Sequence, residues 1–166
     1  VGYQALDANT TANSNTAVGY KTLTTNTTGS QNIALGGSSL QLNTTGAYLT
    51  AIGYAALYAN TTGTQNTAIG FTALDSNTTA DNNTAVGRDA LGANTTGTEN
   101  VALGANALDA NTTASNNTAV GLGSLGGNTT GTSNSALGYG SLGANTTADN
   151  NTGIGYLALN ANTTGI

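Results

Sequence analysis

The chain has 166 residues, of which 5% are charged and 5% aromatic, and it contains no Pro, Cys, Met, Trp or His. Its formal net charge is −5 with only two basic residues, so it lacks the positive charge density that nucleic-acid binding requires. The absence of Cys excludes disulfides and thiolate metal sites. No apolar run approaches the roughly 18 residues of a membrane-spanning helix, so no membrane insertion is expected in this segment.

The chain is an array of 17-residue repeats with no insertion or deletion. Cut before each aliphatic–glycine pair, it reads VGYQALDANTTANSNTA over residues 1–17 and VGYKTLTTNTTGSQNIA over residues 18–34. Nine full units end at Gly153, and a partial tenth follows. Residues 1–166 are therefore predicted to form one uninterrupted array, and the incomplete last unit predicts a slice of a longer fibre. We number the columns of the array by position in the unit, so that Val1 lies in column 1.

Several columns hardly vary along the array. Column 2 is always Gly, column 6 is always Leu, and columns 9 to 11 are always Asn-Thr-Thr. Column 1 is Val, Leu or Ile, column 15 is Asn except at Leu49, and column 17 is Ala except at Gly153. Column 12 alternates between Gly and Ala from Gly63 onward, which indicates a 34-residue super-repeat.

Each unit predicts one coil of an all-β fold. A 17-residue unit is too short for paired helices, whose repeats run to about 33 residues or more. Fixed Gly and Asn positions and β-branched residues in NTAVGY favour short strands between tight turns. We therefore expect a parallel β-solenoid, or β-roll, of about ten coils stacked about 4.8 Å apart, each with two strands and two corners. Constant columns then become ladders, because each residue lies above its equivalent.

The alternation of side chains in residues 15–20 predicts a strand with two distinct faces. Period-2 alternation places Thr16, Val18 and Tyr20 on one face and the small residues Ala17 and Gly19 on the other. The sequence leaves open which face is interior. We expect the aliphatic column 1 and the Leu column 6 to form the core.

Three stretches carry a family resemblance. NTAVGYKTL at 15–23, NTAIGFTAL at 66–74 and NTAVGRDAL at 83–91 resemble the head repeat of YadA-like trimeric autotransporter adhesins. The longer phrase NTAVGYxALxxNTTG is similar to repeat arrays of bacterial surface proteins and phage tail-fibre-type proteins. The resemblance implies a left-handed roll, a homotrimer and exposure on a cell or virion surface. The unit is longer than the commonest head repeats, so the trimer contacts need not carry over.

We expect a non-catalytic structural or adhesive shaft of an extracellular fibre or cell-surface filament. Without His or Cys the usual nucleophile–base pairs are missing, and the acidic residues do not hold one column. No catalytic residue, cofactor or metal site is predicted. The expected partners are further copies of the chain, as a homotrimer or longer filament, and host-surface or matrix glycans or proteins. The alternatives are a phage tail-fibre segment, or an ice- or crystal-surface-binding solenoid that aligns Asn9 with Thr11.

The Asn-Thr-Thr triplet fits the N-glycosylation pattern in every unit. The candidate acceptors are Asn9, Asn26, Asn43, Asn60, Asn77, Asn94, Asn111, Asn128, Asn145 and Asn162. Asn82, Asn116 and Asn150 begin three further matching triplets. The alternative is that Asn caps a turn and stacks into a hydrogen-bonded ladder. We favour the ladder, because sugars about 4.8 Å apart would crowd one another.

Column 3 predicts an aromatic stripe along the rod. Its aromatic members are Tyr3, Tyr20, Tyr54, Phe71, Tyr139 and Tyr156. The column is interrupted at Gly37, Arg88, Ala105 and Leu122. We favour packing in the core or an interface for this stripe, with ligand binding as the alternative.

Overall fold

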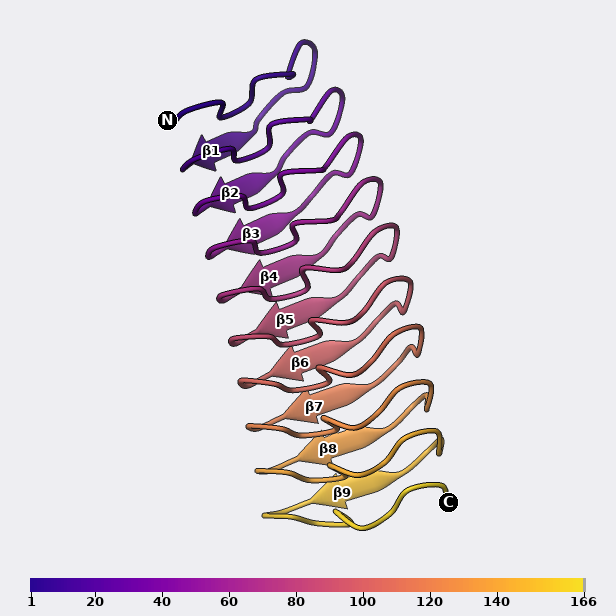
Figure 1. Ribbon diagram of the computed structural model, residues 1–166. Helices are drawn as coiled ribbons and strands as arrows, with labels where there is room; N and C mark the ends of the chain where they lie inside the picture. Colours follow the sequence, from indigo (N-terminus) through magenta and orange to yellow (C-terminus); the bar gives the residue numbers. More distant parts are fainter. Residues whose placement is uncertain (166) are drawn as a thin grey trace.

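The computed structural model describes residues 1–165 as one rod with its termini at opposite ends (Figure 1). Nine strands form a single sheet in the order β1 to β9, and every neighbouring pair is parallel. The strands are β1 (Thr16–Val18), β2 (Ile33–Leu35), β3 (Thr50–Ile52), β4 (Thr67–Ile69), β5 (Thr84–Val86), β6 (Val101–Leu103), β7 (Thr118–Val120), β8 (Ser135–Leu137) and β9 (Thr152–Ile154). Ten units give nine strands because each strand spans the junction between two units.

The strand register equals the repeat length. Thr16 pairs with Ile33, and Ala17 pairs with Ala34, so each residue lies beside its equivalent in the next unit. The same register continues to the last pair of strands, where Ala136 faces Gly153. Residues 1–165 contain no helix. These observations confirm the predicted all-β parallel β-solenoid with one unit per coil.

The wall opposite the sheet consists of turns, so the expectation of two strands per coil is wrong. Columns 4 and 6 have left-handed backbone conformations, for example φ 53° at Gln4 and 57° at Leu6. The Asn9 N–H closes a turn onto the Leu6 carbonyl at 3.2 Å, while the Leu6 N–H donates to Thr22 O in the next coil at 3.0 Å. A left-handed non-glycine residue costs about 1–2 kcal/mol, and hydrogen bonds between coils offset that cost here.

The invariant glycine of column 2 is required by conformation and by space. Gly104 has φ 142°, a region that L side chains rarely adopt. A Cβ placed on it would lie 2.5 Å from the Gly121 carbonyl oxygen in the next coil. This is where the chain leaves the strand and enters the turn wall. The close approach of the two backbones explains why no other residue occupies column 2.

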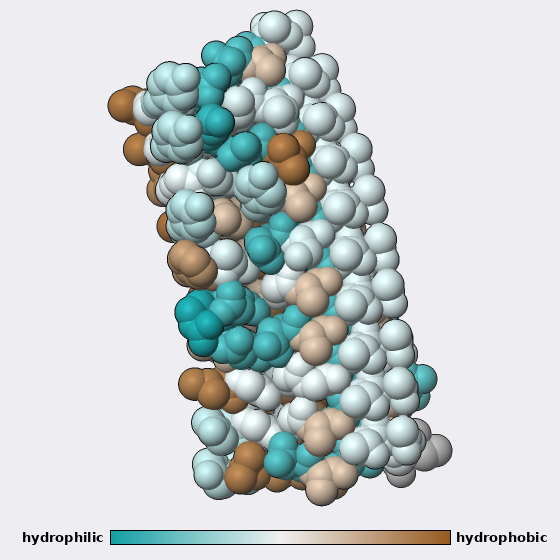
Figure 2. Space-filling view, in the orientation of Figure 1, coloured by the Kyte–Doolittle hydropathy of each residue, from teal (hydrophilic) through white to brown (hydrophobic). Residues whose placement is uncertain are grey.

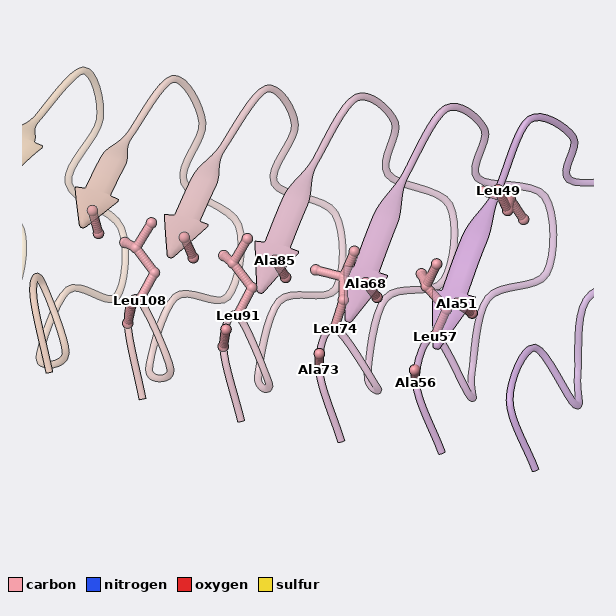
Figure 3. Close-up of a cluster of buried hydrophobic side chains, with 14 of the residues drawn as sticks. Leu49, Ala51, Ala56, Leu57, Ala68, Ala73, Leu74, Ala85, Leu91 and Leu108 are labelled. Atoms are coloured by element: carbon pink, nitrogen blue, oxygen red, sulfur yellow. The ribbon is translucent and has the colours of Figure 1, made fainter. Parts of the chain in front are cut away.

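The core is a column of leucines facing a column of alanines. Figure 3 shows Leu57, Leu74 and Leu91 reaching from the turn wall toward the strands. The side chains of Ala68 and Ala85 point from the strands into the same interior (Figure 3). The column 6 leucines from Leu23 to Leu142 are fully buried, which confirms the Leu part of the predicted core.

The predicted place of column 1 in the core is wrong. Val18 is 45% exposed and Leu137 is 48% exposed, and the other members of this column within the rod are partly or largely exposed. Column 17 alanine points inward, as Ala17 does, and alternation along a strand then turns columns 16 and 1 outward. The inner wall of each strand therefore takes the smallest apolar side chain, and the larger aliphatic residue faces solvent.

Candidate interaction surfaces

The column 9 asparagines form a ladder inside the rod. Asn60 donates from Nδ2 to Asn43 Oδ1 at 2.8 Å and to the Gly63 carbonyl at 3.0 Å, so both amide hydrogens are used. The pattern repeats in successive coils up to Asn145, whose Oδ1 is the one buried side-chain polar atom without a partner in residues 1–165. A buried polar group without a hydrogen-bond partner costs about 1–3 kcal/mol. The ladder avoids this cost in each coil, because it pairs the buried amide of column 9.

This ladder bears directly on the glycosylation hypothesis. Eight of the ten candidate acceptors, from Asn26 to Asn145, are fully buried. A sugar on Nδ2 would replace a donated hydrogen and would have to enter the closed interior, so the folded rod has no room for one there. Asn9 and Asn162 in the end coils are partly buried. The additional sequons fall in column 14, where Asn82, Asn116 and Asn150 are exposed.

A second asparagine ladder occupies column 15 and was not assigned a role from the sequence. Asn83 Oδ1 accepts the backbone N–H of Asn100 at 3.0 Å, and Asn83 Nδ2 donates to the Gly97 carbonyl at 2.8 Å. The Gly97 carbonyl also accepts from Asn94 Nδ2 at 3.0 Å. One column 12 carbonyl thus joins both ladders across two coils. The signal in the sequence was the near-invariance of column 15.

The Asn-Thr-Thr corner presents threonine but not asparagine to solvent. Thr61 donates its hydroxyl to the Thr78 carbonyl at 3.0 Å, and the column 10 threonines repeat this bond. The column 11 threonines, such as Thr62, are exposed. The predicted surface pair of Asn9 and Thr11 is wrong along the rod, because the column 9 side chain turns inward. Figure 2 shows a regular file of pale side chains along one edge of the rod.

The 34-residue super-repeat has a structural counterpart in column 13. Thr64 donates its backbone N–H and its hydroxyl to Asp81 Oδ1, at 2.6 and 2.9 Å. Thr132 makes the same two contacts to Asp149, at 2.6 and 2.9 Å. In both pairs the donor belongs to a unit with Gly in column 12 and the acceptor to the following unit with Ala. The alternation of Gly and Ala in column 12 therefore coincides with column 13 hydrogen bonds that join a Gly-containing coil to the Ala-containing coil after it.

The predicted aromatic stripe lies on the surface. Its six side chains are between 50% and 76% exposed, so they do not belong to the core. They stack in pairs: Tyr3 with Tyr20 at 5.5 Å between ring centroids, Tyr54 with Phe71 at 5.6 Å, and Tyr139 with Tyr156 at 5.3 Å, all within 17° of parallel. The stripe is therefore a broken column of stacked rings.

The outward side of the sheet is a second candidate surface, which we call the outer sheet face. It consists of columns 16 and 1, such as Thr16 and Val18 in β1, and none of its residues is charged. Its larger exposed members include Ile33, Ile69 and Leu103, which are 43%, 36% and 38% exposed. In Figure 2, several brown apolar side chains lie along the edge of the rod opposite the file of pale side chains, most of them near its upper end. Contiguous exposed apolar surface is typical of interaction sites.

Ionisable groups are sparse and mostly solvated. Arg88 pairs with Asp89, the single ion pair found among residues 1–165, and also donates to Asn106 Oδ1 at 2.6 Å. Burial raises the pKa of Asp75, with a smaller contribution from the negative charge of Asp89. The backbone N–H of Thr132, followed by its hydroxyl, lowers the pKa of Asp149. None of these groups lies in a cavity.

No protein-family model, curated protein or solved structure matches this chain. Within residues 1–165, no group of three or more acidic residues is placed to hold a metal ion, and no pocket encloses a ligand. The same residues include no helix long and apolar enough to cross a bilayer. The candidate surfaces are therefore those on the outside of the rod.

Proposed function

We propose that this chain is a rigid, non-catalytic shaft segment of an extracellular fibre. The observation that supports this proposal is the continuity of the buried ladders from coil to coil, for example from Asn43 through Asn60 to Asn77. Each coil contacts its neighbours through the same set of bonds, so stability grows with the number of coils. A rod of this kind can hold a terminal domain away from a surface.

We further propose that the shaft associates laterally with other copies through the outer sheet face. The face runs along nine strands without a charge, and its exposed aliphatic column would be buried by a second sheet or a third. Burying apolar surface stabilises an assembly by about 25 cal/mol per Å². A trimer, as the family resemblance implies, and a longer bundle would both use this face.

Sedimentation velocity at increasing concentration tests the proposal, together with electron microscopy of single particles. We expect straight rods whose mass is a multiple of that of the chain. The double substitution Leu103→Lys with Leu137→Lys places two charges on the outer sheet face and should give monomeric rods. The matched control, Thr96→Lys with Thr130→Lys, places the same charges on the exposed corner and should still associate.

Two results would overturn parts of this proposal. A wild-type chain that remains monomeric at the highest concentration would exclude lateral association while leaving the rod intact. Flexible or collapsed particles in the micrographs would exclude the rigid shaft itself.

A further inference from the structure

Three N-glycosylation sequons lie outside the Asn-Thr-Thr corner, and the fold presents them to solvent. Asn82, Asn116 and Asn150 occupy column 14 and are exposed. Each is followed by a buried column 15 asparagine, such as Asn83, and then by a column 16 threonine, such as Thr84, that is not buried. The second ladder holds the middle residue inside the rod. The asparagine and the threonine that define each sequon therefore both remain accessible.

The side-chain amides of these column 14 asparagines are free of the ladders. Within residues 1–165 their side chains make no hydrogen bond, and their backbone N–H groups donate to the preceding coil at 3.2, 3.1 and 3.0 Å. In column 9, by contrast, Asn94 uses both amide hydrogens, on Asn77 Oδ1 at 3.2 Å and on the Gly97 carbonyl at 3.0 Å. A sugar on Nδ2 would therefore break a hydrogen bond in column 9 but none in column 14.

Column 14 also leaves room for sugars along the rod. The three asparagines occur in every second coil, with Glu99 and Ser133 in the coils between them. Two coil spacings amount to about 10 Å. In adjacent coils of column 3, flat rings already stack at 5.3 to 5.6 Å between their centroids, which leaves no space for bulkier sugar rings in successive coils. Alternate coils can each carry one sugar, whereas the successive sequons of column 9 cannot.

The chain contains thirteen sequons, ten in column 9 and three in column 14, and this number bears on when a sugar is added. An enzyme that acts on the unfolded chain would meet all of them. Eight of the column 9 asparagines are fully buried in the rod, and a sugar on any of these would prevent its burial. An enzyme that acts on the folded rod avoids this conflict, because the fold hides these eight and exposes the three in column 14.

We propose that the rod is N-glycosylated after folding at Asn82, Asn116 and Asn150, with a nucleoside-diphosphate sugar as the donor. Nδ2 forms a bond to C1 of the sugar, and the bond from C1 to the phosphate oxygen breaks. The nucleoside diphosphate leaves with that electron pair, and the amide releases one proton. The sugars lie just before β5, β7 and β9, at the border of the outer sheet face. The proposal does not rest on lateral association through that face.

A transfer assay on the folded chain tests the proposal, with a soluble asparagine N-glycosyltransferase and UDP-glucose as the probe. We expect hexoses at the three column 14 asparagines, located by peptide mass spectrometry, and none at the eight buried asparagines of column 9. A synthetic peptide of residues 91–99 contains the Asn94 sequon outside the fold, and it should be modified. This comparison shows that the fold, and not the local sequence, protects column 9.

Two substitutions in column 14 form a matched pair. Gln65→Asn creates Asn-Asn-Thr over residues 65–67 and should add one modified site. Glu99→Asn creates Asn-Asn-Val over residues 99–101, which is no sequon, and should add none. Both side chains are exposed, and their φ angles of 57° and 59° are close to the 61° of Asn82, so an asparagine fits either position.

Three outcomes would overturn the proposal. The first is a folded rod that accepts no hexose in column 14 under conditions in which the peptide is modified. The second is modification of the eight buried asparagines of the folded rod to the same extent as column 14. The third is the mass of the bare chain in material isolated from the natural source. The Leu103→Lys, Leu137→Lys rod should be modified at the same three sites, so a failure of lateral association would leave these expectations unchanged.

Discussion

Leu49 donates a backbone hydrogen bond to Asn32 in the column 15 ladder, but its own side chain makes none to the next coil. Its backbone N–H donates to Asn32 Oδ1 at 3.0 Å, as an asparagine at this position would. Its own side chain offers no oxygen to the backbone N–H of Asn66 and no amide to the Gly63 carbonyl. In the neighbouring coils these two bonds are present, for example from Asn83 to Asn66 Oδ1 at 2.8 Å.

Leu49→Asn should therefore stabilise the rod. The new amide would accept from Asn66 N–H and donate to the Gly63 carbonyl, and each such bond contributes about 1 kcal/mol. The loss of a buried leucine opposes this gain, since Leu49 is only 1% exposed. Among residues 1–165, the backbone N–H of Asn66 has no partner opposite Leu49, so pairing it should recover about 1–3 kcal/mol, more than an ordinary bond contributes. Against about 1.5–3 kcal/mol for the burial of leucine, we expect a net increase of at most about 1 kcal/mol in the free energy of unfolding, measured by chemical denaturation. A decrease would show that the leucine packing outweighs the ladder.

Gly104→Ala should destabilise the rod strongly. The substitution places a Cβ in an unfavourable φ region and 2.5 Å from the Gly121 carbonyl, which together should cost about 3 kcal/mol or more. The control is Gly123→Ala, where φ is 63° and no atom lies within 4 Å of the added carbon. That variant should lose only about 1 kcal/mol. Equal losses in the two variants would contradict the close backbone approach.

Leu91→Asp should break the rod locally. Leu91 is fully buried in the Leu column, and an unpaired carboxylate in that position should cost more than about 4 kcal/mol. The control lies two residues away. Asp89→Asn keeps an acceptor for the Thr72 hydroxyl and removes a surface ion pair, so its effect should stay within about 0.5 kcal/mol. Amide hydrogen exchange would show which coils open in the Leu91→Asp variant. If the amides near residue 91 were as protected in this variant as in the wild type, the placement of Leu91 in the core would be wrong.

Acidification should weaken the contact between Thr132 and Asp149. Hydrogen bonds from Thr132 lower the pKa of Asp149 below its ordinary 3.8. The folded state therefore binds fewer protons than the unfolded state, so the stabilisation is present above pH 3.8 and is lost as the pH falls through the folded pKa. The wild type should lose more stability on acidification than Asp149→Asn does.

Asp75 changes the free energy of unfolding with pH in the opposite sense to Asp149, so the two contributions must be measured separately. Burial raises its pKa, so its contribution to stability increases as the pH falls through the folded value. The difference between the wild type and Asp149→Asn cancels the Asp75 term, because both chains contain it. Denaturation curves at constant ionic strength would measure the difference, and a difference independent of pH would refute the role of Asp149.

The sequence by itself determined the period, the parallel register and the Leu column. A repeat without insertions forces each residue beside its equivalent, so constant columns become ladders in any parallel stack. It also predicted the Asn-Thr-Thr corner and the aromatic column. These properties follow from spacing alone, which is why they did not depend on knowing the path of the chain within one coil.

Only the tertiary structure decided what lies inside. Ala17 and Val18 are adjacent and both apolar, so alternation could not say which of them faces the core. The interior is narrow because the Leu side chains of the turn wall already fill it, and only alanine fits opposite them. The turn wall also depends on left-handed residues such as Leu6, which no local propensity predicts. The direction of each amide, inward in column 9 and exposed at Asn82, depends on where the closed coil places it.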